Sequence, residues 1–286
     1  MEPYIFQALM GALLFGIGAM FFKWIVQLNG DDNIFFATLY SSGAVCFFIG
    51  GFGGFTELTP THYISGALIG LGAAGGNYFF SKGLRHGPAG LTSAFAKANI
   101  VIVILISSIY YQEPLMLTEI IGIICFLAAM LIVNLKIGGA QRSVSKIWFA
   151  LMVGSMILIA FRNGGLKVVD ELEISSMVVM TLAYIFCAIF FSGNIIKNIN
   201  KDKSENQQTK KVMMIGASTG VISYWGLYFY ITALETGPGS VVVTIFSLDM
   251  LFVLLVSYFI YGERLNFNQK IGFLLSAFGF LLLGIK

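Results

Sequence analysis

Two charged residues, Lys97 and Asp249, stand near the centres of long apolar runs and have the chemistry needed to bind a polar solute. A charge at the centre of a bilayer costs about 2.5–3.5 kcal/mol on insertion scales, so it needs a partner, a wet cavity or a function. An ammonium group can bind a carboxylate, and a carboxylate can bind an amine. The simplest hypothesis is one cavity in which Lys97 and Asp249 hold the two ends of a zwitterion.

An internal repeat argues against this simple arrangement. When the chain is shifted by 150 residues, Lys97 matches Ser247 and Asp249 matches Asn99. Two residues along a helix turn about 200°. If the two copies fold alike, Lys97 and Asp249 lie on opposite faces of equivalent helices.

The neighbours of each charge favour the lysine as the cavity residue. Its face of the helix carries Ser93, and the matching face of the second copy carries Ser247, so both faces are small and partly polar. The face of Asp249 is apolar. This aspartate could bind substrate, pair with Lys23 or Arg162 of a neighbouring helix, or act as a proton site. A buried ion pair is the alternative role for either charge.

Four further side chains are candidates for substrate binding because they could stack on a flat or cationic ligand or hydrogen-bond to it. They are Asn77, Tyr78, Trp225 and Tyr228. Tyr78 and Tyr228 occupy the same position in the repeat. Core packing or anchoring at the membrane interface is the commoner role for such aromatic residues.

The composition indicates what kind of molecule positions these residues. Hydrophobic types make up 57% of the 286 residues, charged types make up 11%, and the mean hydropathy is +0.86. A soluble domain carries about 25% charged residues, so lipid is the expected solvent. Ten apolar runs are long enough to cross a bilayer, which predicts an all-α membrane protein with ten transmembrane helices. The runs are 4–27, 32–54, 64–84, 88–111, 116–135, 147–167, 174–195, 212–234, 239–261 and 267–285.

Several function classes lack the residues that they need. The sequence has no GxxxxGK phosphate loop, and its cysteines and histidines have no metal-ligand spacing. An intramembrane enzyme would need paired catalytic groups within the membrane, and the apolar runs do not supply such a pair. We therefore predict no catalytic residue, metal or cofactor. The net charge of +3 is small and sits mainly in loops, which argues against nucleic acid as a partner. A non-transporting scaffold or receptor is the main alternative to a transporter.

The basic residues indicate how the chain is oriented in the cell membrane. Lys and Arg are enriched in cytoplasmic loops. The loops after the third, fifth, seventh and ninth predicted helices hold most of them, so both termini are expected on the non-cytoplasmic side. These residues are Lys82, Arg85, Lys136, Arg142, Lys146, Lys197, Lys201, Lys203, Lys210, Lys211, Arg264 and Lys270.

The repeat predicts two halves in opposite orientations. Between residues 87 and 136, 12 of 50 positions are identical to those 150 residues later. The predicted units are 1–137 and 145–286, with five helices each. Because five is odd, the second unit enters the membrane from the opposite side, as in transporters that work by alternating access. Shared glycines such as Gly66 and Gly216 are expected at close helix crossings.

The repeated motifs resemble those of a known family. Gly87-Pro88 leads to Tyr111-Gln112-Glu113, and Gly237-Pro238 leads to Tyr261-Gly262-Glu263. A Gly-Pro entry, a helix, a Gly-Glu exit and a second helix with an early glycine (here Gly122 and Gly272) are similar to the EamA family of the drug/metabolite transporter superfamily. Gln112 departs from that pattern, since the family has glycine there.

The resemblance implies a secondary transporter for a small polar or amphipathic metabolite, such as an amino acid or amine. Its partners would be this small-molecule substrate, the lipid bilayer and, as one source of energy, protons. The chain would work as a monomer or homodimer.

Overall fold

The fold is known from a computed structural model, which describes residues 3–99, 101–102, 116–134, 145–198, 206–236, 245–246 and 249–283. Each of the ten predicted runs contains a described helix, which confirms the prediction of an all-α membrane protein. The elements are α1 (Pro3–Gln27), α2 (Asp32–Gly50), a short 3-10 helix η1 (Phe52–Glu57), α3 (Pro60–His86), α4 (Ala89–Lys97), α6 (Leu117–Asn134), α7 (Lys146–Glu171), α8 (Ser176–Asn198), α9 (Asn206–Thr236), α11 (Asp249–Tyr261) and α12 (Phe267–Leu283).

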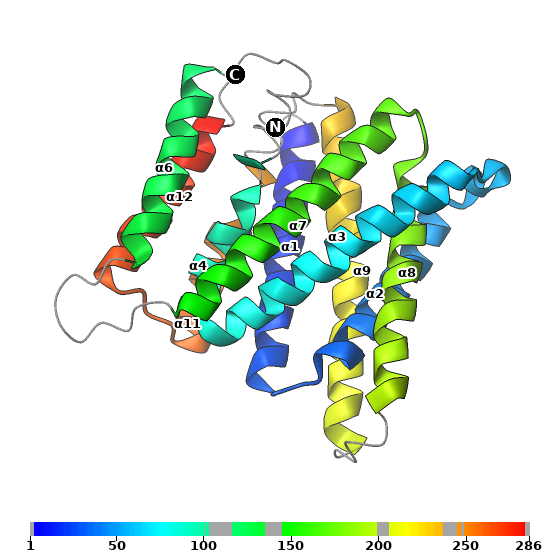
Figure 1. Ribbon diagram of the computed structural model, residues 1–286, viewed down its shortest axis with the longest axis horizontal. Helices are drawn as coiled ribbons and strands as arrows, with labels where there is room; N and C mark the ends of the chain where they lie inside the picture. Colours follow the sequence, from blue (N-terminus) through cyan, green and yellow to red (C-terminus); the bar gives the residue numbers. More distant parts are fainter. Residues whose placement is uncertain are drawn as a thin grey trace.

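The two halves pack around each other as an inverted pair. In Figure 1, α1 runs down the view and α7 runs up it, while α1 begins and α12 ends at the same end of the bundle. The helix contacts have the same symmetry: α1 packs on α9 as α7 packs on α3, and α2 packs on α9 as α8 packs on α3. The pairs α2 with α8, α4 with α11 and α6 with α12 pack on each other. This pattern follows from two similar units of opposite direction.

Glycines allow the central helices to cross closely, as the sequence predicts. A Cβ at Gly66 would lie 2.7 Å from the Cβ of Leu182 on α8, and a Cβ at Gly76 would lie 2.7 Å from a side-chain carbon of Ile159 on α7. On the other unit, a Cβ at Gly216 would collide with the backbone of α2 2.6 Å away. Small residues are the usual means of close approach between helices in lipid.

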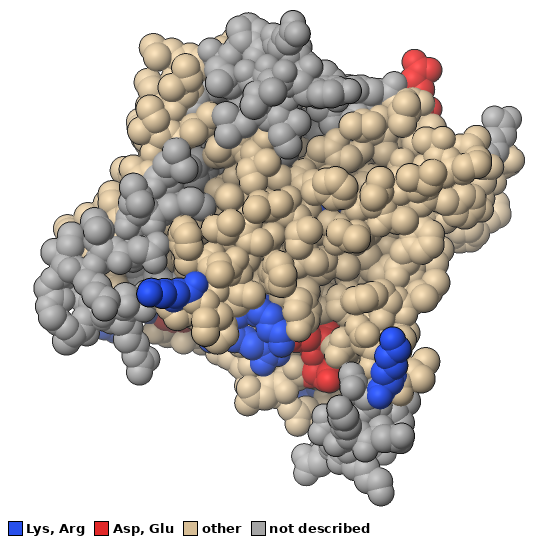
Figure 2. Space-filling view, viewed as in Figure 1, with Lys and Arg blue, Asp and Glu red and all other residues tan. Residues whose placement is uncertain are grey.

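The core and the lipid-facing surface are both apolar. Phe35, Phe36, Tyr40 and Phe47 on α2 are fully buried between α8 and α9. Five described helices are long and apolar enough to cross a membrane: α1, α2 and the greater parts of α7, α8 and α9. Figure 2 shows that most charged side chains on the visible face lie at its lower end, below a wide uncharged zone.

The described backbone departs from the predicted helices at two functional positions. The run 88–111 was expected to be one helix, but α4 ends at Lys97, and Ala98 and Val101 donate to the carbonyls of Phe95 and Ala98, three residues before each. Such tighter turns mark a local break in an α-helix. Conversely, Gly164 and Gly165 do not interrupt α7, which continues to Glu171.

Candidate functional site

A buried ion pair joins the two repeats, between the end of α4 and α11. The ammonium of Lys97 lies 2.8 Å from the Oδ2 of Asp249, and the two side chains are 21% and 6% exposed. Lys97 is in the last turn of α4, where a positive charge complements the helix dipole. Asp249 lies on α11 and is nearly buried beside it.

The structure corrects the predicted partners of Asp249. Lys23 pairs instead with Glu263, at 2.6 Å, and Arg162 donates to the side chain of Asn163. The prediction failed because a rotation of about 200° for two residues holds only within a regular helix. The break after Lys97 removes that regularity, and the two charges meet between the helices.

Aromatic rings from both repeats surround the ammonium of Lys97. The ammonium lies 5.7 Å from the ring centre of Phe15 on α1 and 5.0 Å from that of Phe246. The two rings make an edge contact at 5.0 Å. A cation over an aromatic face gains about 0.5–2 kcal/mol. Asp249 has its second oxygen, Oδ1, buried with no hydrogen-bond partner among the described residues, so the site keeps an unused acceptor.

A chain of polar side chains connects this pair to α7. The amide of Asn163 donates to the Oδ1 of Asn99 at 2.9 Å, and Asn99 donates to the carbonyl of Ala96 at 2.6 Å. Arg162 donates to the Oδ1 of Asn163 from two nitrogens, at 3.1 and 3.0 Å. Asn99 and Asn163 are not among the site residues predicted from the sequence, which names Arg162 only as a possible partner of Asp249. The available signal was the repeat itself, since Asn99 is the counterpart of Asp249.

The remaining predicted site residues lie in different places. Ser93 is 4% exposed on α4, one turn before Lys97. Ser247 lies outside the described residues. Asn77 donates to the hydroxyl of Tyr40 at 3.0 Å. Tyr78 lies under the ammonium of Lys82, 5.2 Å away, and lines a cavity of about 590 Å³ between α3, α7 and α8. The structure therefore places Ser93 on the helix that carries Lys97, and joins Asn77 and Tyr78 to other groups.

Trp225 and Tyr228 belong to the outer face of α9. They are 46% and 37% exposed, and their ring centres lie 5.7 Å apart. Within the described parts of the chain, their other ring contacts are with Tyr224 and Phe229, and neither ring contacts Lys97 or Asp249. Their exposure favours the membrane-anchoring role that the sequence also left open.

A second ionic tie joins the repeats at the end of the bundle. Glu263 accepts from Lys23 at 2.6 Å and from the backbone nitrogen of Ala89 at 2.7 Å. Lys23 also donates to the carbonyl of Leu84 at 3.1 Å. Glu263 is placed by a turn in which Gly262 has φ +63° and the nitrogen of Glu263 donates to the carbonyl of Ser257. This is a common way to end a helix.

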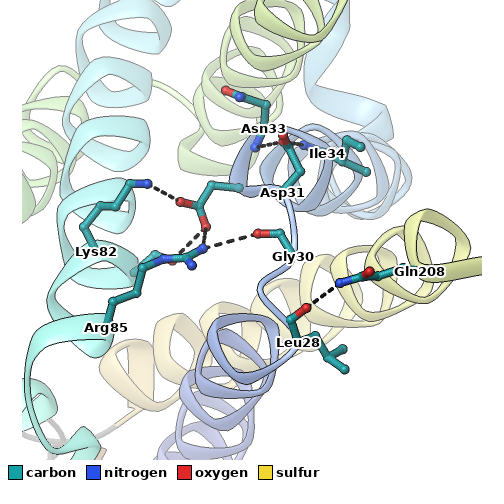
Figure 3. Close-up of polar contacts among 10 residues, drawn as sticks. Leu28, Gly30, Asp31, Asn33, Ile34, Lys82, Arg85 and Gln208 are labelled. Carbon is teal, nitrogen blue, oxygen red and sulfur yellow. Dashed lines mark hydrogen bonds and ion pairs between the residues drawn. The ribbon is translucent and has the colours of Figure 1, made fainter. Parts of the chain in front are cut away.

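A third cluster at the same end lies within the first repeat. Figure 3 shows Lys82 and Arg85 of α3 reaching toward the start of α2, where each lies 2.8 Å from an oxygen of Asp32. Arg85 also donates to the carbonyl of Gly30 at 3.2 Å. Asp31 accepts from the first backbone nitrogens of α2, which caps that helix. These contacts hold the turn between α1 and α2 against α3.

Two inverted units of membrane helices, with a buried ion pair between them, are typical of membrane transporters of the two-repeat kind. The chain belongs to the EamA-like transporter family, whose model matches residues 2–135 and 146–285. A solved structure described as "Crystal structure of protein" has the same fold, with a TM-score of 0.60, 12% identity, and coverage of 95% of this chain and 94% of that one. No curated protein matches this sequence.

Proposed function

We propose that this chain is a secondary transporter that moves a small polar or amphipathic metabolite, such as an amino acid or an amine, across the cell membrane by alternating access. The observation that carries the proposal is the Lys97–Asp249 pair. It lies between the two repeats, at the point where α4 breaks. Broken helices with charged ends at mid-membrane depth are typical of solute sites in transporters.

The mechanism follows from which contacts cross between the repeats. Lys97–Asp249 and Lys23–Glu263 both join the first repeat to the second. Rocking one repeat against the other must separate Lys23 from Glu263 before that end of the bundle can open. A substrate that binds Lys97 or Asp249 would replace the interaction lost there, and so lower the barrier to the motion. The substrate gradient, an exchanged solute or protons would supply the energy.

The orientation in the membrane follows from the basic end of the bundle. In Figure 1, α3 ends and α7 and α12 start toward the end of the bundle at which α1 stops and α2 starts. These parts of the three helices carry Lys82, Arg85, Lys146 and Lys270. We assign this end to the cytoplasm because Lys and Arg are enriched there. Both termini are then outside the cytoplasm. Assembly as a monomer or a homodimer is compatible with this arrangement.

Uptake into proteoliposomes tests this function. Purified wild type is assayed with labelled amino acids and amines, with and without a proton gradient, beside Lys97→Ala and the control Lys270→Gln at an exposed position of α12. We expect wild type and the control to transport and Lys97→Ala to insert but not transport. Wild-type rates in Lys97→Ala would remove Lys97 from the site. Folded wild type that moves no solute would support a scaffold or receptor instead.

A further inference from the structure

Arg162 is a cation inside the membrane that the sequence assigned only as a partner of Asp249. It lies on α7 within the stretch Lys146–Leu166, which is long and apolar enough to span the bilayer. Its side chain is partly buried. A guanidinium is charged at all physiological pH values, and a charge at this depth marks a functional site by default.

No carboxylate among the described residues forms an ion pair with Arg162. The described carboxylates with cationic partners are Asp32, Asp249 and Glu263, and these pair with other cations. Arg162 instead donates from two nitrogens to one neutral acceptor, the Oδ1 of Asn163. Lys97 and Asp249 neutralise each other, so the described part of this site carries one net positive charge. A bound carboxylate would neutralise it.

The backbone holds Arg162 firmly at this place. A Cβ at Gly72 of α3 would lie 3.0 Å from the nitrogen of Arg162 and 2.8 Å from the carbonyl oxygen of Leu158, so α3 and α7 touch there through their backbones. The hydroxyl of Ser155 donates to the carbonyl of Gly76 at 2.9 Å and ties the same two helices. A preformed position lowers the entropy that binding must overcome.

The surroundings of Arg162 suit a carboxylate with a second polar group nearby. Through Asn163 and Asn99, the guanidinium is linked to the segment that follows Lys97.

We propose that Arg162 binds the carboxylate of the transported solute, so that the substrates are small carboxylates or amino acids, and simple amines are excluded. This proposal rests on the transporter function proposed above. The planar guanidinium can bind a carboxylate through two parallel hydrogen bonds. For an amino acid, the ammonium group would lie toward Asp249, whose Oδ1 has no partner among the described residues.

A set of three ligands that share an isobutyl group separates the chemical classes. Leucine carries both groups, 4-methylpentanoate carries only the carboxylate, and 3-methylbutylamine carries only the amine; the other common amino acids and their matched acids and amines extend the set. Binding is measured as thermal stabilisation of the purified protein in detergent, and transport as uptake into proteoliposomes. The variants are Arg162→Gln, Arg162→Lys and Lys270→Gln, which removes the same charge from an exposed position of α12.

We expect carboxylates and amino acids to stabilise wild type and Lys270→Gln, and amines to have no effect. Arg162→Gln should weaken carboxylate binding at least tenfold. Arg162→Lys, which keeps the charge without the planar fork, should retain part of the binding and show that the fold survives.

Two results would overturn the proposed role of Arg162 without contradicting the transporter function. One is transport of amines but of no carboxylate, and the other is unchanged carboxylate affinity in Arg162→Gln. Either would leave the chain a transporter. Folded wild type that neither binds nor moves any member of the set would contradict the transporter function and the carboxylate site together.

Discussion

The Asp32 cluster and the Lys97–Asp249 pair both bury a carboxylate against a cation, but they join different parts of the molecule. Asp32 contacts both Lys82 and Arg85, and all three belong to neighbouring helices of one repeat. Asp249 contacts one cation, across the boundary between the repeats. Both carboxylates are nearly buried, at 5% and 6% exposure, so burial does not distinguish them.

The difference lies in what each contact would have to do during transport. In the alternating-access mechanism proposed above, motion of one repeat against the other leaves the Asp32 cluster intact, because its members move together. The same motion must strain or break the pair at Asp249. An ion pair held by two cations within one rigid unit therefore serves stability, whereas a single pair between moving units, with an unused acceptor beside it, can exchange partners with a solute.

Replacing both residues of the Lys97–Asp249 pair gives the largest expected effect and separates function from stability. We expect Lys97→Met/Asp249→Leu to lower the transport rate at least tenfold, which corresponds to about 1.4 kcal/mol. The free energy of unfolding should change little, because well-packed apolar residues often replace a buried ion pair without loss. Transport is measured in proteoliposomes and stability by thermal unfolding in detergent.

The single variant Lys97→Met is the control for this prediction. It leaves Asp249 buried without its cation, so it should be less stable than the double variant. A double variant with full transport would make the pair a structural element like the Asp32 cluster, and would remove the distinction between the two regions.

The opposite outcome is expected at Asp32. Asp32→Asn should lower the free energy of unfolding by about 3 kcal/mol, the lower end for breaking a buried pair, because Lys82 and Arg85 are partly exposed. Transport per folded molecule should stay near the wild-type rate, because the cluster does not cross between the repeats. The measurements are thermal unfolding and uptake normalised to inserted protein. Loss of transport in Asp32→Asn at unchanged stability would show that the Asp32 cluster takes part in substrate movement.

Sequence reasoning located the helices and the repeat because both depend on patterns that are local or periodic. Apolar runs predicted all ten segments, and the shift of 150 residues predicted two similar units of opposite direction. The packing of α1 on α9 and of α7 on α3 agrees with that symmetry. Lys97 and Asp249 stood out because charge in an apolar run is costly. Their pairing was missed because the break at Ala98 depends on tertiary contacts, such as the packing of α4 against both α7 and α11.

Arg162 was undervalued for a related reason. The sequence named it only as a possible partner of Asp249, and the adjacent Gly164-Gly165 would weaken an isolated helix at this place. In the structure Gly165 instead packs beside Ile69 of α3, where a Cβ would lie 3.0 Å from a side-chain carbon. Packing against α3 keeps α7 helical, and this places Arg162 inside the membrane stretch. Such tertiary effects leave no local pattern in the sequence.

The Lys23–Glu263 ion pair shares one property with each of the two regions. Like the Asp32 cluster it lies at the end of the bundle, and like the Lys97–Asp249 pair it joins the two repeats. Its position depends on Gly262, whose φ of +63° suits glycine, and no neighbouring atom would obstruct a Cβ there. We expect Gly262→Ala to lower the free energy of unfolding by about 1 kcal/mol, through backbone strain alone. Gly262→Asn, which tolerates this conformation better, should lose less. Thermal unfolding and uptake are measured for both variants.

If the contact between Lys23 and Glu263 holds the cytoplasmic end closed, Gly262→Ala should also change the uptake rate in proportion to its loss of stability, and Gly262→Asn should change it less. Equal stability in the two variants would contradict backbone strain as the cause, and an uptake rate unaffected by either would place Glu263 with the Asp32 cluster as a purely structural contact.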